Sequence, residues 1–583
     1  MRIVTYHYIM TVNFKGKELH ANLRVTMSGV ENSRLERLSG MLKRRGIILP
    51  AFEIHGGSKG LYDFGPIGGR IRNRVNQTWI DHWTSLGNIT EISCPTVTPY
   101  QVLEASGHVG EFSDFLTDCN SCGEASRADT LLEDFHSNPD SLSKSDLQEL
   151  LDESKPKCPA CGSCDWSQIS AQNLMFNTTI GAGKSGRQGF LRPETAQGMF
   201  TSFQSLYRHN RERLPFGAIQ VGKGYRNEIS PRQGMIRLRE FNMAELEYFI
   251  DPDEEINHDF SSWNDVKFSL IPDGGKEVSK SLSDAVESGL IRHSTVGYFM
   301  GMTYDFLMKV GIDADKLRFR QHESDEMAHY ALDCWDAEIL GSYGWVECVG
   351  IAHRGCYDLQ AHETATGKTL RARREFKEPK TIEIDGWTIE GSVAGPAFRA
   401  LAGAVKVAIE SLPLDTEFPC KISLDSGDVV TVNPEHVKRN QKTEVVTGEW
   451  FIPHVVEPAF GIDRIIWHVL DHAYDEIEKG DDRYTVLRLS ENITSVDYCV
   501  FPLFEKDGMG EIARELNKKI CSKSGVISLY DSSGSIGRRY ARADEVGVPV
   551  CITVDHQTLE DNTVTLRNRD SGEQKRVDIE TLY

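Results

Sequence analysis

The 583-residue sequence lacks a continuous apolar run of the length needed to cross a bilayer, and its start lacks a signal-peptide pattern. It also lacks an excess of positive charge, since 65 Lys and Arg residues face 86 Asp and Glu residues, for a formal net charge of −21. An acidic total argues against nonspecific coating of nucleic acid but allows a local basic patch. We therefore expect a cytoplasmic protein with no membrane partner.

A phosphate-binding loop of the common type is also missing. Gly181, Gly183 and Lys184 lie close together, but their order is not G-x-x-x-x-G-K-[ST]. We therefore reject a P-loop and interpret this stretch as a flexible glycine-rich loop.

The length is too great for one hydrophobic core and predicts roughly two to four domains. Hydrophobic residues at 39% and charged residues at 26% are ordinary for a globular protein. We expect an N-terminal extension, a core in two parts separated by a cysteine-rich insertion, and a C-terminal unit: 1–32, 33–115, 116–170, 171–490 and 491–583. A second insertion is expected at about 365–450. Met27 is a candidate start of translation, a hypothesis that N-terminal mass spectrometry tests.

The thirteen cysteines are expected as free thiols or metal ligands in a reducing compartment. Four of them form two C-x-x-C pairs, each followed by glycine: Cys119, Cys122, Cys158 and Cys161. Such knuckles fit a structural zinc site with four thiolates, although the gap between the pairs is longer than usual. The alternative is four buried free thiols, and Cys164 would be a competing fifth ligand.

Residues 218–251 predict an antiparallel hairpin with a long basic loop. A side-chain period of two places Arg226 and Glu228 on one face of the first strand. The second strand places four residues on one face: Phe241, Met243, Glu245 and Glu247. Such a floor can hold a phosphorylated aromatic ligand with a small cation. A solvent-exposed polar face, common in antiparallel sheets, would explain the charges but not Phe241.

Other segments predict helices and strands around this hairpin. Pro66 begins a helical pattern, and the run that ends near Pro95 suits an edge strand. Residues 450–470 predict a strand, a break at Glu457-Pro458, and a helix with Arg464 near its N-terminus. A positive charge there opposes the helix dipole, so we expect an anion beside it.

The C-terminal unit alternates strands and helices, which predicts an α/β domain of about a hundred residues. It carries a local basic patch with an aromatic ring: Arg538, Arg539, Tyr540 and Arg542. Such a patch suits RNA phosphates and bases, although a solvated helix face would explain it equally well.

The order of these motifs resembles one family closely, the class II glycyl-tRNA synthetases of the archaeal and eukaryotic-like dimeric type. GLYDFGPIGGRIRNRVNQTW with Pro95, GYRNEISPRQGMIRLREFNMAELEYF and EPAFGIDRI look like the three class motifs. EASGHVGEFSDF, LRPETAQGMF and SIGRRYARADEVG resemble further signatures of this family. The resemblance covers nearly everything from Ser33 onward. It implies an α+β fold, with an antiparallel sheet flanked by helices, a zinc-ribbon-like insertion and a C-terminal α/β anticodon-binding domain.

The resemblance implies a set of residues for ATP and Mg²⁺: Arg226, Asn227, Glu228, Ile236, Arg237, Leu238, Arg239, Glu240, Phe241, Glu347, Cys348 and Arg464. In the family, the arginine at Arg226 binds the α-phosphate, and a forked guanidinium suits that charge. Glu228 resembles the acceptor from the adenine amino group, and Phe241 the ring that stacks on adenine. Arg237 looks like the contact to the outer phosphates.

The glycine pocket implied by the resemblance has three carboxylates for the ammonium, Glu194, Glu245 and Glu457, with Arg127 at the substrate carboxylate. The full implied set is Arg127, Glu194, Phe241, Asn242, Met243, Ala244, Glu245, Glu457, Pro458 and Ala459. Carboxylates packed this closely should raise at least one pKa. The implied partners are glycine, tRNA-Gly (with Arg538, Arg539 and Arg542 as candidate contacts) and a second copy of the chain in a homodimer.

Two positions depart from the family pattern. Ala459 stands where serine is usual, and His353 where aspartate is more usual. Neither change removes an anchor for phosphate or ammonium, so we expect activity with altered glycine affinity. The expected function is glycine–tRNA ligation through a glycyl-adenylate. The alternatives are a paralogue for another small amino acid and an RNA-binding subunit without catalysis, although such subunits lose the ATP arginines first.

Overall fold

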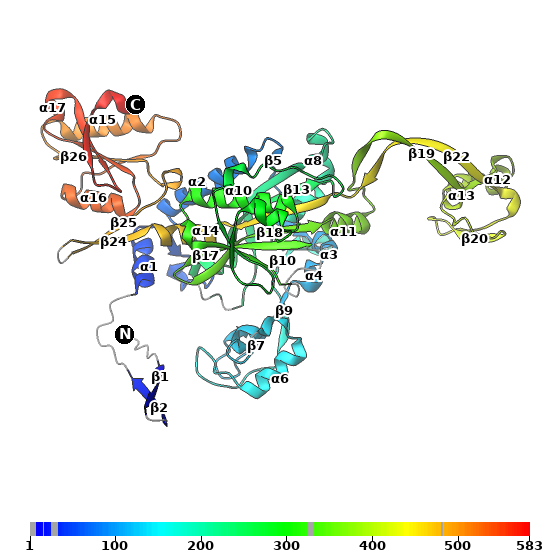
Figure 1. Cartoon of the computed structure of the whole chain (residues 1–583), viewed down its shortest axis with the longest axis horizontal. Helices are drawn as coiled ribbons and strands as arrows, with labels where there is room; N and C mark the ends of the chain where they lie inside the picture. Colours follow the sequence, from blue (N-terminus) through cyan, green and yellow to red (C-terminus); the bar gives the residue numbers. More distant parts are fainter. Residues whose placement is uncertain are drawn as a thin grey trace.

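The structure is a computed structural model that describes residues 7–14, 17–24, 33–136, 138–229, 231, 234–323, 332–479 and 482–583. Figure 1 shows a central body from which three units extend: the C-terminal unit, a unit that contains β7 and α6, and a long ribbon with a small tip. β1 (His7–Phe14) and β2 (Lys17–Arg24) form a separate hairpin. The candidate start Met27 lies outside the described residues. The predicted α+β class is confirmed.

The central body contains a nine-stranded sheet in the order β15-β14-β16-β17-β18-β23-β13-β12-β5. Neighbouring strands are antiparallel except β14/β16 and β12/β5, which are parallel. In sheet order the bounds are β15 (Val278–Lys280), β14 (Phe268–Ile271), β16 (Leu317–Gln321), β17 (Asp333–Gly341), β18 (Gly344–Gly355), β23 (His454–Gly461), β13 (Glu240–Ile250), β12 (Phe216–Tyr225) and β5 (Ile89–Glu91). The strand before Pro95 is an edge strand, as predicted.

Three helices pack on one face of this sheet: α2 (Pro66–Thr84), α10 (Ser294–Val310) and α14 (Ile462–Ala473). Aromatic rings fill the layer between them. The rings of Trp83 and Phe299 meet edge-on with centroids 5.2 Å apart, and those of Phe306 and Phe460 meet edge-on at 5.5 Å. Side chains alternate along a strand, so burial of Phe460 on the helix side turns Ala459 to the opposite face. That opposite face is free to line a ligand site.

The predicted break at Glu457-Pro458 is wrong, because β23 continues through both residues. The strand pairs with β18 from Phe460 to Val455, but its pairing with β13 is interrupted between Ala459 and Val456. Proline has no N–H to donate, so the ladder opens on the β13 side instead of the strand ending. This opening lies beside Glu457.

The cysteine-rich insertion forms its own small unit. Its strands are β7 (Ser113–Asp118), β8 (Ala125–Arg127) and β9 (Ser170–Asn173), and its helices are α5 (Ala128–Leu132) and α6 (Lys144–Ser154). Ala128, Leu132, Leu147, Leu151 and Ile169 form its core.

The second insertion is a ribbon of β19 (Ala372–Ile389) and β22 (Val437–Phe451). Its tip carries α12 (Gly391–Phe398), α13 (Ala402–Glu410), β20 (Cys420–Ser423) and β21 (Val429–Val432). Val405 and Ile409 are buried in the core of this tip.

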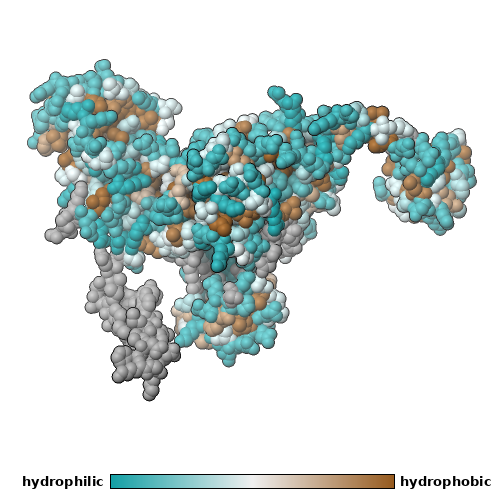
Figure 2. All heavy atoms as spheres, viewed as in Figure 1, coloured by the Kyte–Doolittle hydropathy of each residue, from teal (hydrophilic) through white to brown (hydrophobic). Residues whose placement is uncertain are grey.

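The tip contains an exception to the expectation that no apolar run is long enough to cross a bilayer. Among the described residues, one helical stretch, Gly391–Glu410, is long and apolar enough to cross a membrane by length and composition. Its path is interrupted, because Pro396 lies inside α12 and Arg399 has a φ of 46°. Figure 2 shows the tip as a mostly hydrophilic surface with scattered apolar patches. Val405 and Ile409 of this stretch pack into the core of the tip, although only 17% of the stretch is buried.

The C-terminal unit has a five-stranded sheet in the order β27-β26-β28-β29-β30. The strands are β26 (Tyr498–Pro502), β27 (Ser528–Tyr530), β28 (Val550–Val554), β29 (Thr563–Asn568) and β30 (Gln574–Asp578), with helices α15 (Met509–Cys521) and α16 (Ile536–Glu545). The predicted alternation of strands and helices continues as far as β29, with α17 (Thr558–Asp561) between β28 and β29, and β30 then follows β29 directly. A hairpin of β24 (Tyr474–Lys479) and β25 (Asp482–Leu487) leads into this unit.

Candidate active site

The hairpin β12–β13 organises the site. Its register pairs Gly224 with Phe241 and Gly222 with Met243. A Cβ on Gly224 would lie 2.6 Å from the Phe241 ring, and one on Gly222 would lie 2.1 Å from the Arg192 guanidinium. Glycine at these positions lets the larger side chains lie against the strand.

A cavity of about 180 Å³ lies over this hairpin. Most of the predicted residues line it: Arg226, Glu228, Ile236, Arg237, Leu238, Phe241, Asn242, Met243, Glu245, Glu347, Cys348, Ala459 and Arg464. The other predicted residues in this part of the chain do not line it: Arg127, Glu194, Asn227, Arg239, Glu240, Ala244, Glu457 and Pro458. Because β12 ends at Tyr225, Arg226 and Glu228 lie just beyond the strand and not on it as expected.

Three guanidinium groups surround one end of the cavity. The Arg226 guanidinium lies 5.5 Å from the Phe241 ring centroid, and its buried Nε has no hydrogen-bond partner among the described residues. Arg237 is partly exposed and lies 3.9 Å from the Glu228 carboxylate. Arg464 extends from the first turn of α14 into the same space. This end of the cavity is suited to an anion.

The negative group expected beside Arg464 is the Glu347 carboxylate, but backbone carbonyls make the closer contacts. Arg464 donates from Nε to the Ile236 carbonyl at 3.1 Å and from Nη1 to the Glu347 carbonyl at 2.7 Å. The Glu347 carboxylate lies 3.6 Å from Nη1, and its side chain is 53% exposed. The guanidinium is thus oriented by backbone carbonyls, while Glu347 stays accessible from the cavity.

Several predicted nucleotide or glycine residues have structural roles instead. Arg239 donates to the carbonyls of Glu228 and Lys59, which fixes the loop after β12. Glu240 forms an ion pair with Lys223 across the hairpin. Ala244 is fully buried in the core on the helix side of the sheet.

Three predicted carboxylates come together here: Glu245 lines the cavity, Glu457 and Glu194 lie beside it, and each has a hydrogen-bond donor. The backbone N–H and the hydroxyl of Thr195 both donate to Glu245, the former at 2.8 Å. Gln197 of α7 (Ala196–Thr201) donates to Glu194 at 2.9 Å. The imidazole of His108, from α4 (His108–Glu111), lies 3.3 Å from Glu194.

Arg354 holds the third carboxylate, and the sequence analysis did not assign it a role. Arg354 donates from Nη1 to Glu457 at 2.6 Å and from Nε to Asp358 at 2.9 Å. Asp358 belongs to α11 (Tyr357–Thr366) and also accepts from Gln197 at 3.1 Å. The sequence signal that could have indicated this pair is the apolar run of β18, which ends near Arg354 and is followed by Asp358 four residues later.

The predicted rise of a carboxylate pKa is confirmed. Burial, with Glu457 and Glu194 nearby, raises the pKa of Glu245 to about 8. Burial also raises the pKa of Glu457, although Arg354 opposes the shift. Burial would raise the pKa of Glu194 as well, but His108, Arg354 and Gln197 together hold it well below its usual range. The cluster therefore mixes ionised and proton-binding carboxylates.

Asp463 is a second residue that sequence reasoning missed. It lines the cavity from the first turn of α14 and accepts from the backbone N–H of Asn242 at 2.7 Å and from its amide at 2.8 Å. Burial raises the pKa of Asp463 to about 6, and the bonds from Asn242 oppose the rise. These two bonds to Asp463 hold Asn242 in place on the cavity floor.

Arg127 and His353 lie outside the cavity. Arg127 forms ion pairs with Asp114 at 3.0 Å and with Asp129. His353 is buried, and its Nε2 lies 3.2 Å from Nδ1 of His454. The departure from the family pattern at His353 therefore does not change the lining of the cavity.

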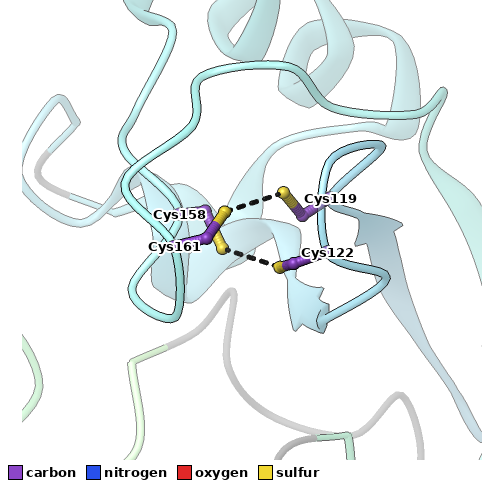
Figure 3. Close-up of side chains that lie close together, drawn as sticks. All are labelled: Cys119, Cys122, Cys158 and Cys161. Carbon is purple, nitrogen blue, oxygen red and sulfur yellow. Dashed lines mark hydrogen bonds between the residues drawn. The ribbon is translucent and has the colours of Figure 1, made fainter.

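The four cysteines of the two knuckles come together in the insertion (Figure 3). The Sγ atoms of Cys119 and Cys161 lie 3.6 Å apart, those of Cys122 and Cys158 lie 3.8 Å apart, and all four lie within 4.8 Å of one another. Each knuckle is closed by a glycine N–H that donates to the first cysteine's carbonyl, from Gly123 and Gly162, both at 2.8 Å. The φ angles of these glycines are 72° and 78°, which favour glycine. Cys164 is not part of the cluster.

The basic patch of α16 is only partly exposed. Arg538 is exposed. Arg539 is 5% exposed and donates to the carbonyls of Pro502 and Gly534 inside the unit. Arg542 is half-buried and donates to Asp531 at 2.6 Å. Arg538 is therefore the arginine of this patch that is most accessible to a partner.

Comparison with known proteins places these features in a family. Residues 182–309 match the tRNA synthetase class II core domain (G, H, P, S and T), and residues 497–583 match the anticodon binding domain. The glycine–tRNA ligase of Methanothrix thermoacetophila is 43% identical over 557 residues, which cover 94% of this chain and 95% of that protein. The glycine–tRNA ligase of Methanocaldococcus jannaschii is 43% identical over 574 residues, 95% of this chain and 98% of that protein. Among solved structures, Giardia lamblia prolyl-tRNA synthetase in complex with prolyl-adenylate aligns with a TM-score of 0.48 at 13% identity, over 94% of this chain and 75% of that chain. The chain belongs to the glycine–tRNA ligase family.

Proposed function

We infer that this protein activates glycine with ATP to form glycyl-adenylate and pyrophosphate, and then transfers glycine to the 3′ end of tRNA-Gly. The observation that carries this proposal is one cavity lined by three guanidinium groups and by the buried carboxyl group of Glu245, which has Glu457 and Glu194 as neighbours. The guanidinium groups suit a polyphosphate and the carboxylates an ammonium group.

For the nucleotide, the family resemblance supports a role for each of the groups that line the cavity. Arg226 would bind the α-phosphate with its forked donors, and Arg237, which is more exposed, the outer phosphates. Phe241 would stack on adenine, with Arg464 over its other face, and Glu228 would accept from the adenine amino group.

Mg²⁺ fits the carboxylate of Glu347, which is half-exposed beside Arg464, because Mg²⁺ is usually held by one or two carboxylates together with substrate phosphates. When bound, it neutralises charge on the phosphates. Cys348 offers no thiolate, since burial raises the pKa of its thiol far above the usual range. Its thiol lies 3.6 Å from His468 Nδ1 on the helix side of the sheet.

The glycine end selects by charge and by lack of space. Glu245 and Glu457, with Glu194 behind them, would surround the ammonium group. Arg127 stays a proposed anchor for the substrate carboxylate, but it would have to exchange one of its pairs with Asp114 or Asp129 to bind it.

The chemistry needs no protein nucleophile. The glycine carboxylate oxygen attacks the α-phosphorus in line, the bond to the bridging oxygen breaks, and pyrophosphate leaves with the electron pair. The arginines stabilise the charge that develops. The terminal ribose hydroxyl of tRNA then attacks the carbonyl carbon of the mixed anhydride, the bond from that carbon to the phosphate oxygen breaks, and AMP leaves with the electron pair while the hydroxyl proton is released.

The test is ATP–pyrophosphate exchange with glycine, alanine or serine, followed by charging of tRNA-Gly transcripts. Glycine-dependent exchange and charging are expected. Exchange that prefers alanine or serine would favour a paralogue, and no exchange with any of them would contradict the proposal. Loss of charging after anticodon changes, and after Arg538→Ala, would support recognition by the C-terminal unit.

We also propose a structural zinc ion on Cys119, Cys122, Cys158 and Cys161. Four thiol sulfurs within 4.8 Å on two glycine-closed knuckles fit the tetrahedral, closed ligand set of structural zinc. Native mass spectrometry should show one zinc per chain, which Cys119→Ser removes and Cys164→Ser retains. Native protein without zinc would reject the site.

A homodimer and a cytoplasmic location complete the proposal. Near α2, Phe52 is 64% exposed and Ile54 is 93% exposed, as expected for residues that a second copy covers. All thirteen cysteines are free, as a reducing compartment requires. Light scattering should give a dimer that Ile54→Asp weakens, and a monomeric native protein would contradict the dimer.

A further inference from the structure

Glu247 is buried beside the proposed glycine pocket with no partner. Its side chain is 0% exposed, and both of its carboxyl oxygens lack a hydrogen-bond partner among the described residues. Glu247 is paired with Ala218 of β12, which offers no polar side chain. An ionised carboxylate in such surroundings is very costly, so a group in this position takes up a proton instead.

The charged neighbours of Glu247 lie on its own strand and on three other elements, β23, β18 and α11. Glu245 shares its strand face, and the register of β13 with β23 places Glu457 across from it, where Pro458 opens the ladder. The carboxyl oxygens of Glu245, Glu247 and Glu457 lie within 4.8 Å of one another. Arg354 of β18 and Asp358 of α11 are the other charged neighbours.

One positive charge among four acidic groups cannot support four anions. Arg354 donates to Glu457 and Asp358, and Thr195 donates twice to Glu245, so those three acids have bonds that favour the ionised form. Glu247 has none. Burial and the nearby Glu457 raise the pKa of Glu247 well above its usual value, and Arg354 only partly opposes the rise.

We propose that Glu247 is held as a neutral carboxylic acid whose O–H donates to the Glu457 carboxylate and positions it to accept the ammonium group of glycine. Glu247 is then a positioning residue, since it has no access to the cavity. The proposal rests on the proposed function, because it concerns the same glycine pocket. It explains how two adjacent buried carboxyl groups avoid repulsion, since the shared proton makes their contact attractive.

The test compares two variants of Glu247 in glycine-dependent pyrophosphate exchange by the full-length protein. Glu247→Gln keeps a neutral donor of similar size, so the KM for glycine and kcat should stay within about twofold. Glu247→Leu keeps the volume but cannot donate, and the loss of a hydrogen bond to a charged group should raise the KM for glycine at least about tenfold. The KM for ATP should be unchanged in both.

The pH profile separates positioning from a packing role. A neutral Glu247 adds no charge to the cluster, so Glu247→Gln should leave the pH dependence of kcat/KM for glycine unchanged. If Glu247 were an anion, the Gln variant would weaken glycine binding and shift the profile to lower pH, and either result would overturn the proposal. An unchanged glycine KM in Glu247→Leu would also overturn it. Wild-type protein without glycine-dependent exchange would instead refute the proposed function.

Discussion

Glycine activation should depend strongly on pH through Glu245. Burial, with Glu457 and Glu194 nearby, raises the pKa of this carboxyl from 4.5 to about 8. Only the ionised form attracts an ammonium group, so the fraction of protein that can bind glycine grows as the pH rises toward 8. At pH 7 about one tenth of the molecules would have Glu245 ionised, and at pH 6 about one hundredth, since each pKa unit is a factor of ten.

The raised pKa of Glu245 favours glycine binding at high pH but lowers the stability of the folded protein there. Between the unfolded pKa of 4.5 and the folded pKa of about 8, the folded protein holds a proton that the unfolded chain has lost. The free energy of unfolding therefore falls as the pH rises through this window, by up to about 1.4 kcal/mol per pH unit. Glu245→Gln should remove this loss of stability at pH 8 while it abolishes glycine activation.

The assay is kcat/KM for glycine in pyrophosphate exchange at saturating ATP, from pH 6 to pH 9. We expect a rise of about tenfold per unit that levels off above pH 8. Thr195→Val is the matched variant, because it deletes the hydroxyl that donates to Glu245 with little change in volume. A hydrogen bond to a charged group is worth about 1.5–3 kcal/mol, so loss of the hydroxyl should shift the profile to higher pH by roughly one to two pH units. A flat profile between pH 6 and pH 8, or an unmoved profile in Thr195→Val, would refute the reasoning.

Three further predictions concern other residues. Ala459→Ser, which places a hydroxyl beside Glu245 in the register, should change the KM for glycine and not that for ATP; an unchanged glycine KM would contradict it. Arg226→Lys should lower exchange at least about hundredfold because an ammonium cannot replace a fork, and near-wild-type exchange would contradict the α-phosphate role. Burial and two neighbouring histidines lower the pKa of His353 from 6.5 to about 3. Between these two pH values the unfolded chain binds a proton at His353 that the folded protein does not bind, so stability falls as the pH drops below 6.5. His353→Asn should flatten that fall in urea titrations at pH 5 and pH 7, and an unchanged difference would contradict it.

Features with a local cause were predictable from the sequence. The alternation that places Phe241, Met243 and Glu245 on one face follows from the strand period alone. Ser33 forms a capping box with Glu36, a pattern contained within four residues. The cysteine knuckles are equally local, because each needs only two cysteines and a glycine.

Features that depend on distant segments were not predictable in the same way. The bond from Arg354 to Glu457 joins residues 103 positions apart, and the bond from Gln197 to Asp358 spans 161. Pro458 looked like a break because proline usually excludes a central strand, yet β18 on the other side keeps β23 in place. Arg539 looked like a surface residue of a basic patch, but its guanidinium donates inside the unit to the carbonyl of Pro502, 37 positions away.

In the proposed glycine pocket, the bonds that hold the carboxylates would also favour glycine over alanine. Glu245 is held by Thr195, Glu457 by Arg354 and Glu194 by His108 and Gln197, so none can retreat without leaving a buried polar group unpaired. That costs about 1–3 kcal/mol, whereas burial of one extra methyl group gains only about 0.8 kcal/mol. The balance disfavours alanine whenever its methyl group displaces a carboxylate. Thr195→Val removes the hydroxyl bond to Glu245 and leaves only the backbone N–H to hold it, so it should narrow the ratio of glycine to alanine exchange. An unchanged ratio would place the discrimination elsewhere.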